Sequence, residues 1–126
     1  MHKSRMAVFV LDHNVDDPAE AARFWSTALG CEVDVEASKI DPVYTVLDTP
    51  DDQPNVLLQR VDHPPRIHMD IETDDIEAEA KRLEAAGAKR VSAVKTWVVM
   101  EAPTGHRFCL VKPQRPDFDE KANVWP

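Results

Sequence analysis

Cysteine, glycine and aromatic residues are scarce in this sequence of 126 residues, and the shortages exclude several classes of protein. The two cysteines, Cys31 and Cys109, stand far apart without the paired spacing of a disulfide framework or a zinc knuckle. We therefore expect reduced thiols, with a disulfide between the two as the alternative. No phosphate-binding glycine loop, CxxC pair or Ser-His-Asp order is present, so nucleotide-binding, redox and hydrolase functions have no support.

Positive charge is also in deficit, and long apolar runs are missing. Fifteen Lys and Arg residues face 23 Asp and Glu residues, which gives a net charge of −8 and argues against nucleic acid or an anionic membrane as a partner. The longest apolar run, Met6 to Leu11, is too short to span a bilayer, and Asp12 ends it before a signal-peptide core could form. We therefore expect a cytoplasmic protein.

Two helices are indicated, each beginning at an acidic residue and ending at a glycine. Asp17 can cap free backbone N–H groups, Pro18 is tolerated at the first helical position, and Gly30 ends the first helix. Asp75 and Gly87 bound the second helix in the same way. Apolar side chains recur at helical spacing and predict one buried face on each helix: Ala21, Phe24, Trp25 and Leu29 in the first, and Ile76, Ala80, Leu83 and Ala86 in the second.

The segments around these helices make the chain look like an internal duplication. Placing Asp17 over Asp75, an offset of 58 residues, aligns 9–12 with 67–70, and both segments alternate like strands. Three more strands are expected after each helix, at 32–37, 43–48 and 55–61 in the first half and at 90–94, 97–100 and 107–112 in the second. We predict module one at about 6–61, a linker at 62–65, module two at about 66–112 and a tail at 113–126. Because each module is too small to bury its apolar faces alone, we expect both to form a single domain over 1–126.

Several motifs along both halves resemble the vicinal oxygen chelate superfamily, which includes glyoxalase I, bleomycin-resistance proteins, fosfomycin-modifying enzymes and extradiol dioxygenases. The similarity runs from Val8 to Lys112 and is greatest to the glyoxalase-like proteins of bacteria. It rests on these motifs: Val10-Leu11-Asp12, Asp17-Pro18, Ala22-Arg23-Phe24-Trp25, Leu29-Gly30, Ile67-His68-Met69-Asp70, Asp74-Asp75, Gly87-Ala88 and Pro103-Thr104-Gly105-His106-Arg107-Phe108-Cys109-Leu110. Since this fold carries lyases, transferases, dioxygenases and plain binders, the resemblance leaves the reaction open.

The resemblance implies an α+β fold in which two βαβββ modules form a curved mixed sheet around a central cavity, with the helices outside. Strand alternation then assigns side chains to the two faces of the sheet. Phe9, Leu11, Ile67, Met69 and Ile71 should lie under the helices. Val10, Asp12, His68 and Asp70 should face the cavity.

Metal-dependent members of the superfamily use four ligand positions, which fall in this chain at Val10, Gln59, His68 and Cys109. Val10 has no donor atom, Gln59 offers only an amide oxygen, and Cys109 replaces the usual carboxylate. We therefore expect no catalytic metal. If a divalent metal is present, His68 and Gln59 are its expected ligands.

The first functional hypothesis is a metal-independent enzyme that acts on a small organic molecule, with His68 as base or orienting donor. The side chains expected around the substrate are Val10, Asp12, Gln59, Asp70, Trp97 and Cys109. Three alternatives apply to single residues: His68 can be hydrogen-bonded to Asp70 or Asp12 for structural reasons, Trp97 can pack at the sheet edge, and Cys109 can be a small buried hydrophobic residue.

Two other classes of function stay open at this point. One is a binding protein that sequesters a small molecule, as bleomycin-resistance members do, and the other is a divalent-metal-dependent lyase or dioxygenase. The resemblance also implies a homodimer, either side by side or with exchanged modules. The tail could pack on its own chain or on a partner subunit.

Overall fold

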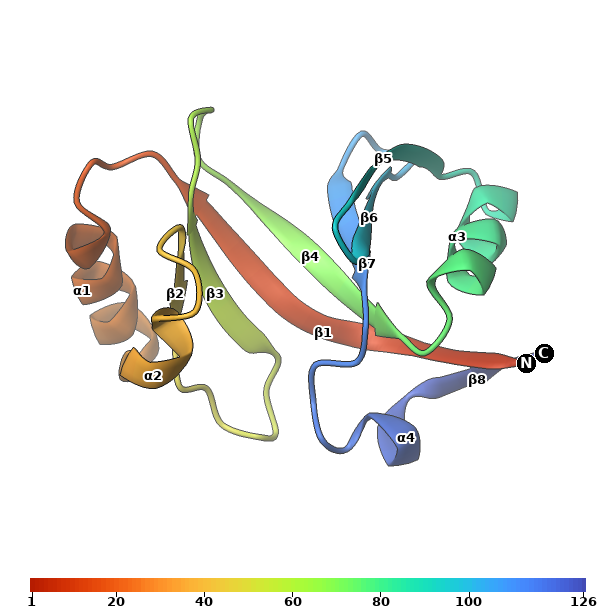
Figure 1. Cartoon of the computed structure of the whole chain (residues 1–126), viewed down its shortest axis with the longest axis horizontal. Coiled ribbons are helices and arrows are strands. Elements are labelled where there is room, and N and C mark those ends of the chain that lie inside the picture. The colour runs from red at the N-terminus through yellow and green to blue at the C-terminus, as the bar shows by residue number, and fades with distance from the viewer. The chain divides into compact units, whose positions relative to one another are not determined.

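A computed structural model describes all 126 residues of the chain and shows an α+β protein with four helices and eight strands (Figure 1). The backbone divides into two compact units. One unit comprises Val8–Ile67, and the other comprises Met1–Ala7 together with His68–Pro126. We refer to them as the first unit and the second unit, and the long strand β1, His2–His13, contributes to both. No helix is both long enough and apolar enough to cross a membrane.

The first unit contains one main helix packed on a small mixed sheet. Its elements are the later part of β1, α1 (Pro18–Leu29), α2 (Val35–Ser38), β2 (Tyr44–Val46) and β3 (Asn55–Arg60). Strand β3 is parallel to β1 and antiparallel to β2. The buried contact between sheet and helix consists of Leu11, Leu58, Ala21 and Ala22, with Trp25 packed at its margin.

The predicted ends of α1 are confirmed. The side chain of Asp17 accepts a hydrogen bond from the backbone N–H of Ala19, Pro18 is the first helical residue, and Gly30 ends the helix at φ 68°. The expectation that Phe24 is buried is wrong, because its side chain is 63% exposed. Phe24 follows Ala21 by three residues and lies at the edge of the buried stripe, where its ring meets that of Trp25 edge to face at 5.1 Å.

The strand expected at 32–37 is also wrong. Val33 forms a single bridge to Leu47, and the chain then turns into α2. The side chain of Asp34 caps this helix by accepting from the N–H of Ala37, and the hydroxyl of Ser38 accepts a hydrogen bond from Val46 N at 2.8 Å. These local polar contacts favour a helical turn over an extended strand at this point.

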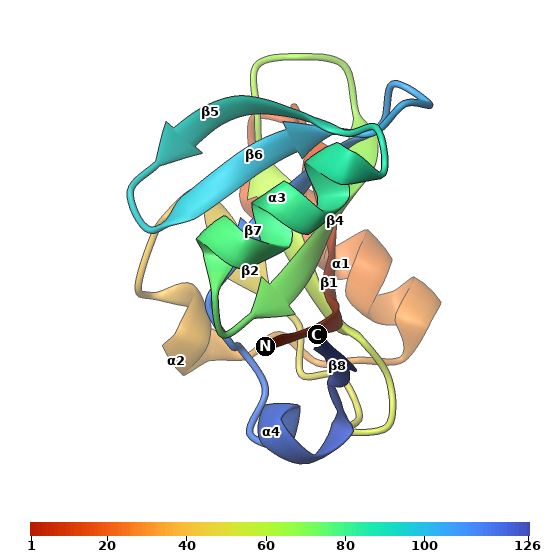
Figure 2. The same ribbon diagram turned by 90° about the vertical axis from the view of Figure 1, so that its right-hand side faces the viewer.

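The second unit repeats the plan of one helix on a mixed sheet. Its elements are β4 (Arg66–Thr73, which begins two residues before the unit), α3 (Ile76–Ala85), β5 (Lys89–Val94), β6 (Trp97–Glu101), β7 (Arg107–Val111), α4 (Phe118–Lys121) and β8 (Asn123–Trp125). Strand β7 is parallel to β4, and β5, β6 and β7 are antiparallel neighbours. Helix α3 lies along this sheet in Figure 2, with Ala80, Met100 and Leu110 buried in the contact.

The strand registers support the duplication residue by residue. Asp12 lies opposite Gln59 across β1 and β3, and Asp70 lies opposite Cys109 across β4 and β7. Asp12 and Asp70 are the residues that the offset of 58 equates. The predicted α+β class with a mixed sheet is confirmed, and the single-domain organisation and central cavity stay predictions.

The C-terminal tail folds onto the second unit through a buried carboxylate that the sequence did not reveal. Glu72 of β4 is fully buried and accepts hydrogen bonds from Arg5 Nε at 2.6 Å, Gln114 N at 2.6 Å and Arg115 N at 3.1 Å. A buried carboxylate needs this many donors, because burial without hydrogen bonds would cost several kcal/mol. Glu72 therefore fixes the point at which the tail leaves the sheet.

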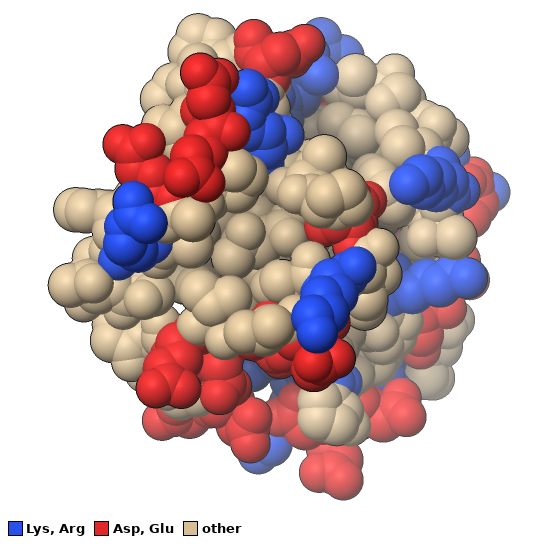
Figure 3. Space-filling view, turned by 60° about the vertical axis from the view of Figure 1, so that its left-hand side comes forward, with Lys and Arg blue, Asp and Glu red and all other residues tan.

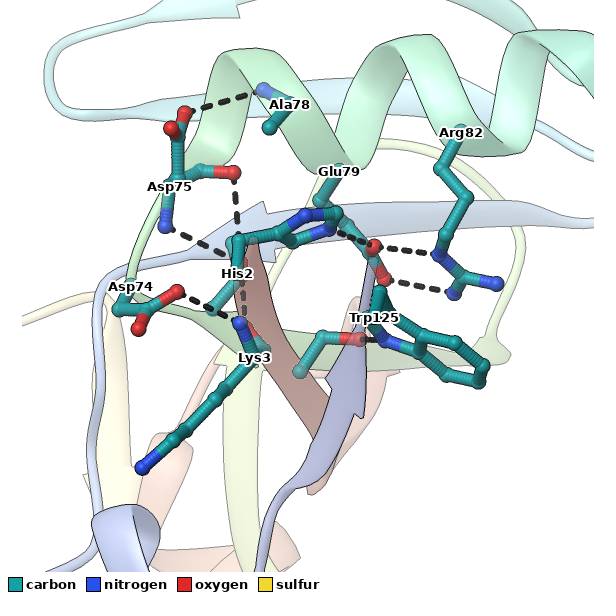
Figure 4. Close-up of polar contacts among 10 residues, drawn as sticks. His2, Lys3, Asp74, Asp75, Ala78, Glu79, Arg82 and Trp125 are labelled. Carbon is teal, nitrogen blue, oxygen red and sulfur yellow. Dashed lines mark hydrogen bonds and ion pairs between the residues drawn. The ribbon is translucent and has the colours of Figure 1, made fainter.

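The two chain ends are joined around a second buried carboxylate, Glu79 of α3 (Figure 4). His2 Nε2 lies 2.8 Å from Glu79 Oε1, and Arg82 donates to both carboxylate oxygens at 2.7 and 2.9 Å. The guanidinium of Arg82 also lies 3.8 Å from the ring centre of Trp125, whose indole N–H donates to Ser4 Oγ. Burial opposes the charge on Glu79, but hydrogen bonds from Arg82, Ser4 and His2 outweigh it and lower the pKa of Glu79 to about 2.

Candidate functional site

Three side chains of different chemistry converge on one face of the sheet in the second unit. His68 and Asp70 are two residues apart in β4 and so point to the same side, and the register places Cys109 of β7 beside Asp70. One ligand atom from each of the three residues lies within 4.8 Å of the other two. We call these three residues the His68 cluster.

The His68 cluster is largely shielded from water. The side chains of His68 and Asp70 are each 14% exposed, and Cys109 is partly buried. His68 Nε2 lies 3.7 Å from Asp70 Oδ1, which is too long for a direct hydrogen bond between these two atoms. An imidazole in this setting can take up a proton and return it to a bound molecule.

The other face of the same strands packs against helix α3, which fixes the orientation of the His68 cluster. Ile71, Phe108 and Leu110 contribute to the apolar cluster under α3. Because β4 and β7 alternate, burial of these side chains turns His68, Asp70 and Cys109 to the opposite face. The prediction that Ile71 lies under the helix is confirmed, whereas the prediction that Ile67, on the same face of β4, is also covered is wrong, because Ile67 is 62% exposed.

Trp97 lies on the same face of the sheet as the His68 cluster. Val99 of β6 is opposite Cys109, and Trp97 is two residues before Val99 on the same strand. The Trp97 ring is partly buried, and the ammonium of Lys95 lies 5.9 Å from its centre. An aromatic ring at this position could stack on a flat ligand.

The remaining predicted site residues belong to the first unit and share one sheet face there. Val10, Asp12 and Gln59 lie on one side of β1 and β3, and Leu11 faces helix α1 as predicted. Gln59 Nε2 donates to the hydroxyl of Tyr44 at 3.3 Å. Val10 is 1% exposed and contributes only apolar surface.

Asp12 lies near an arginine and a histidine that the sequence did not single out. Its side chain is 2% exposed, and its Oδ2 lies 3.6 Å from Arg66 Nε and 3.9 Å from His63 Nε2. Burial, followed by the charge of Arg60, lowers the pKa of the neighbouring His13. His63 was assigned only to the linker and Arg66 to the start of module two. An acidic residue at the end of β1 was the one available signal that such partners exist.

The residues present do not fit the four-ligand metal site of the family. Val10, at one of the four positions that the resemblance implies, offers no donor atom, and Gln59, whose amide nitrogen donates to Tyr44, offers only a neutral amide oxygen. The residues that could hold a metal ion are instead the three members of the His68 cluster. Cys31 and Cys109 are not joined by a disulfide, in agreement with the prediction.

Figure 3 shows groups of Asp and Glu side chains on one face of the molecule, with Lys and Arg side chains among them. The net charge of −8 repels polyanions at long range. This charge distribution is compatible with a small-molecule ligand.

Comparison with known proteins establishes the family. The glyoxalase-like domain family matches residues 8–111, and the chain therefore belongs to this family. A search of curated proteins finds no match.

Solved structures share the fold at low sequence identity. Methylmalonyl-CoA epimerase from Mycobacterium tuberculosis has a TM-score of 0.62 and 14% identity, over 86% of this chain and 87% of the epimerase. A hypothetical protein from Bacillus halodurans has a TM-score of 0.62 and 9% identity, over 89% and 96% of the two chains. Homoprotocatechuate 2,3-dioxygenase from Brevibacterium fuscum has a TM-score of 0.57 and 19% identity, and 89% of this chain covers 33% of the dioxygenase. At these identities the likeness shows the fold alone.

Proposed function

We propose that this protein binds a small organic molecule on the sheet face that carries the His68 cluster and acts on it by proton transfer at His68, without a catalytic metal. The observation that carries the proposal is the convergence of His68, Asp70 and Cys109 on one shielded face. Membership of the glyoxalase-like family supports a small-molecule ligand.

His68 acts as the base in this proposal. A ring nitrogen of the neutral imidazole takes a proton from a C–H or O–H group of the bound molecule, and the electron pair of that bond stays on the molecule. Asp70, 3.7 Å from His68 Nε2, stabilises the imidazolium that results. Return of the proton to the same or another atom of the molecule restores the neutral imidazole.

Two other predicted site residues on the same face of the second unit bind or orient the molecule. Trp97 offers a ring for stacking, and Cys109 offers a polarizable surface beside Asp70. The predicted roles of Val10, Asp12 and Gln59, which belong to the first unit, stay predictions. The proposal includes a cytoplasmic homodimer of a single-domain chain, which rests on the composition and on the family resemblance.

The test measures binding and turnover separately on the full chain. A panel of small carboxylic acids and phenols is screened for binding by thermal shift. It includes homoprotocatechuate and methylmalonyl-CoA, the compounds that appear in the names of two structural relatives. For a compound that binds, turnover is followed by mass spectrometry in the protein and in the His68→Ala and His68→Gln variants. We expect at least a ~100-fold loss of turnover in both variants, because general-base catalysis contributes about 10²–10⁴-fold.

His106 provides the matched control, since it is an exposed histidine of the second unit whose Nδ1 lies 2.7 Å from Thr104 Oγ1. His106→Ala should leave turnover unchanged. Binding without turnover in the unmodified protein would support sequestration instead. A stoichiometric transition metal that is required for turnover would replace the metal-free reaction with the metal-dependent alternative.

A further inference from the structure

Four polar side chains form a row across the sheet of the second unit at the level of His68. Lys89 of β5 lies opposite Glu101 of β6, and Glu101 lies opposite Arg107 of β7. Strands β4 and β7 are parallel neighbours, and continuing their register by one residue sets His68 beside Arg107. Because residues paired across neighbouring strands project to the same side, all four share one face of the sheet. We call them the polar row.

The polar row lies on the side of the sheet that carries the His68 cluster. Met100 and Phe108 belong to the apolar cluster under α3, and they are the chain neighbours of Glu101 and Arg107. Alternation therefore turns Glu101 and Arg107 away from the helix. The side chain of Arg107 is 40% exposed, so a molecule from solvent can reach it.

The polar row carries more positive than negative charge, although the protein as a whole is acidic. Arg107 Nε donates to Glu101 Oε1 at 3.1 Å, and Lys89 Nζ lies 3.5 Å from Glu101 Oε2. Hydrogen bonds from Arg107 and Lys89 lower the pKa of Glu101, so this carboxylate is ionised at neutral pH. Two cations and one carboxylate leave one positive charge next to His68. The terminal Nη groups of Arg107 donate to no other group of the protein.

A guanidinium with both terminal nitrogens available can bind carboxylate or phosphate oxygens through paired hydrogen bonds. The single excess charge of the polar row balances one carboxylate. A phosphate monoester carries close to two negative charges near neutral pH and would also meet the nearby carboxylate of Asp70. A carboxylate is therefore the anion that suits this position.

We propose that Arg107 binds the carboxylate of the substrate, and that the substrate is a small organic acid whose acidic C–H or O–H lies within a few bonds of that carboxylate. The short separation follows from the register, because neighbouring strands lie about 4.8 Å apart and Arg107 stands beside His68. The assignment of the proton to His68 rests on the proposed function. Arg107 thus determines specificity, and His68 performs the proton transfer.

The test compares a carboxylic acid with its own primary amide, which removes the negative charge and keeps nearly the same shape. The acid is the one that binds the full chain most tightly in the thermal-shift panel, and titration calorimetry gives the dissociation constants of acid and amide. The acid should bind the unmodified chain at least about 10-fold more tightly than the amide does, because charge-assisted hydrogen bonds are the stronger ones.

Arg107→Gln should weaken binding of the acid by at least about 10-fold and leave binding of the amide nearly unchanged. Arg107→Lys should recover part of the loss, because lysine keeps the charge without the paired hydrogen-bond geometry. The ratio of the two dissociation constants is taken within each variant, so a general loss of folded protein cancels from it.

Arg90→Gln is the matched control. Arg90 adjoins Lys89 in β5, and its guanidinium donates to Glu77 and Glu84 of α3, on the other side of the sheet. This variant should keep the ratio of the unmodified chain. An equally large ratio in Arg107→Gln would overturn the inference. A panel in which no acid binds, or a phosphate monoester that binds more tightly than the matching acid, would overturn the assignment to a carboxylate.

Turnover separates this inference from the proposed function. Arg107→Gln should raise KM much more than it lowers kcat, because the carboxylate is bound alike before and during proton transfer. His68→Ala should abolish turnover and keep the preference for the acid over the amide. Turnover that survives in His68→Ala, together with a preference that disappears in Arg107→Gln, would contradict the proposed function and leave the carboxylate contact standing.

Discussion

The two units share a scaffold but differ in the chemistry they carry on it. Both place an aspartate of the first strand opposite a residue of the last parallel strand, Asp12 opposite Gln59 and Asp70 opposite Cys109. Two residues before each aspartate, the first unit has Val10 and the second has His68. Duplication thus accounts for the fold, and a few substitutions on one sheet face concentrate the reactive groups in the second unit.

The units also differ in how they are held together. The first unit shows an apolar contact between α1 and its sheet, centred on Leu11 and Leu58. The second unit has the equivalent apolar contact and, in addition, two fully buried carboxylates that tie down the chain ends, Glu72 and Glu79. We expect the second unit to depend on buried charge more than the first does.

The largest effect should follow from Glu72→Gln. The substitution leaves the charge of Arg5 without its buried partner, which costs about 3–5 kcal/mol in comparable buried pairs. Urea unfolding should show this loss, and trypsin should cut near Arg115 sooner than in the unmodified chain. Asp117→Asn removes the more exposed partner of Arg5 and should have a smaller effect. Unchanged stability and unchanged trypsin cleavage in Glu72→Gln would show that Glu72 does not anchor the tail.

Leu58→Ala and Leu110→Ala compare the two apolar contacts directly. Both leucines are 0% exposed and lie under the helix of their own unit. Each truncation should cost about 2–5 kcal/mol, because it leaves a cavity in a packed core. Similar losses in urea unfolding would support equivalent apolar contacts in the two units. A small loss in only one variant would show that the two contacts are not equivalent.

Glu79→Gln should produce a smaller loss with a distinctive dependence on pH. The pKa of Glu79 is about 2 in the folded chain against 4.5 ordinarily, so its stabilisation is complete above about pH 4.5 and is lost as the pH falls toward 2. The variant should lose about 1–3 kcal/mol at pH 7 and converge with the unmodified chain near pH 2. Thermal unfolding between pH 2 and 7 measures this. Glu77→Gln, an exposed partner of Arg90, is the control and should change stability little. A constant difference at every pH would contradict the assignment.

The smallest effect is expected at Gln59, the counterpart of Cys109 in the first unit. Gln59→Leu removes the hydrogen bond to the Tyr44 hydroxyl and should cost about 0.5–1.5 kcal/mol. Tyr44→Phe removes the same bond and should give a similar loss in urea unfolding. The double variant should lose less stability than the sum of the two single losses, because the two side chains share one interaction. Fully additive losses would show that the bond contributes nothing.

The parts of the fold that follow local rules could be predicted from the sequence. Acidic caps and glycines bound α1 and α3, and strand alternation assigned Leu11 and Ile71 to the helix side. The errors arose where side chains compete with the backbone or where distant contacts decide. Hydrogen bonds of the Asp34 and Ser38 side chains stabilise helix α2 where the sequence predicted a strand. The tail elements α4 and β8 depend on partners far away in the sequence, such as Glu72 and His2–Ser4.

The candidate site shows the same division. Alternation and the family resemblance named His68, Asp70 and Cys109 separately, and the strand register explains why they meet. The partners of Asp12 were missed, because Arg66 and His63 reach it through chain geometry that no local pattern encodes. Their contact with Asp12 is consistent with a structural role for that carboxylate.

The central claim is that the reactive chemistry lies at His68 in the second unit. A crystal structure of the chain with the small molecule that raises its melting temperature most would test this claim directly. The account predicts that the molecule contacts His68, with Asp70 and Cys109 beside it. A molecule bound away from all three, with the His68 imidazole hydrogen-bonded only to bulk water, would contradict it.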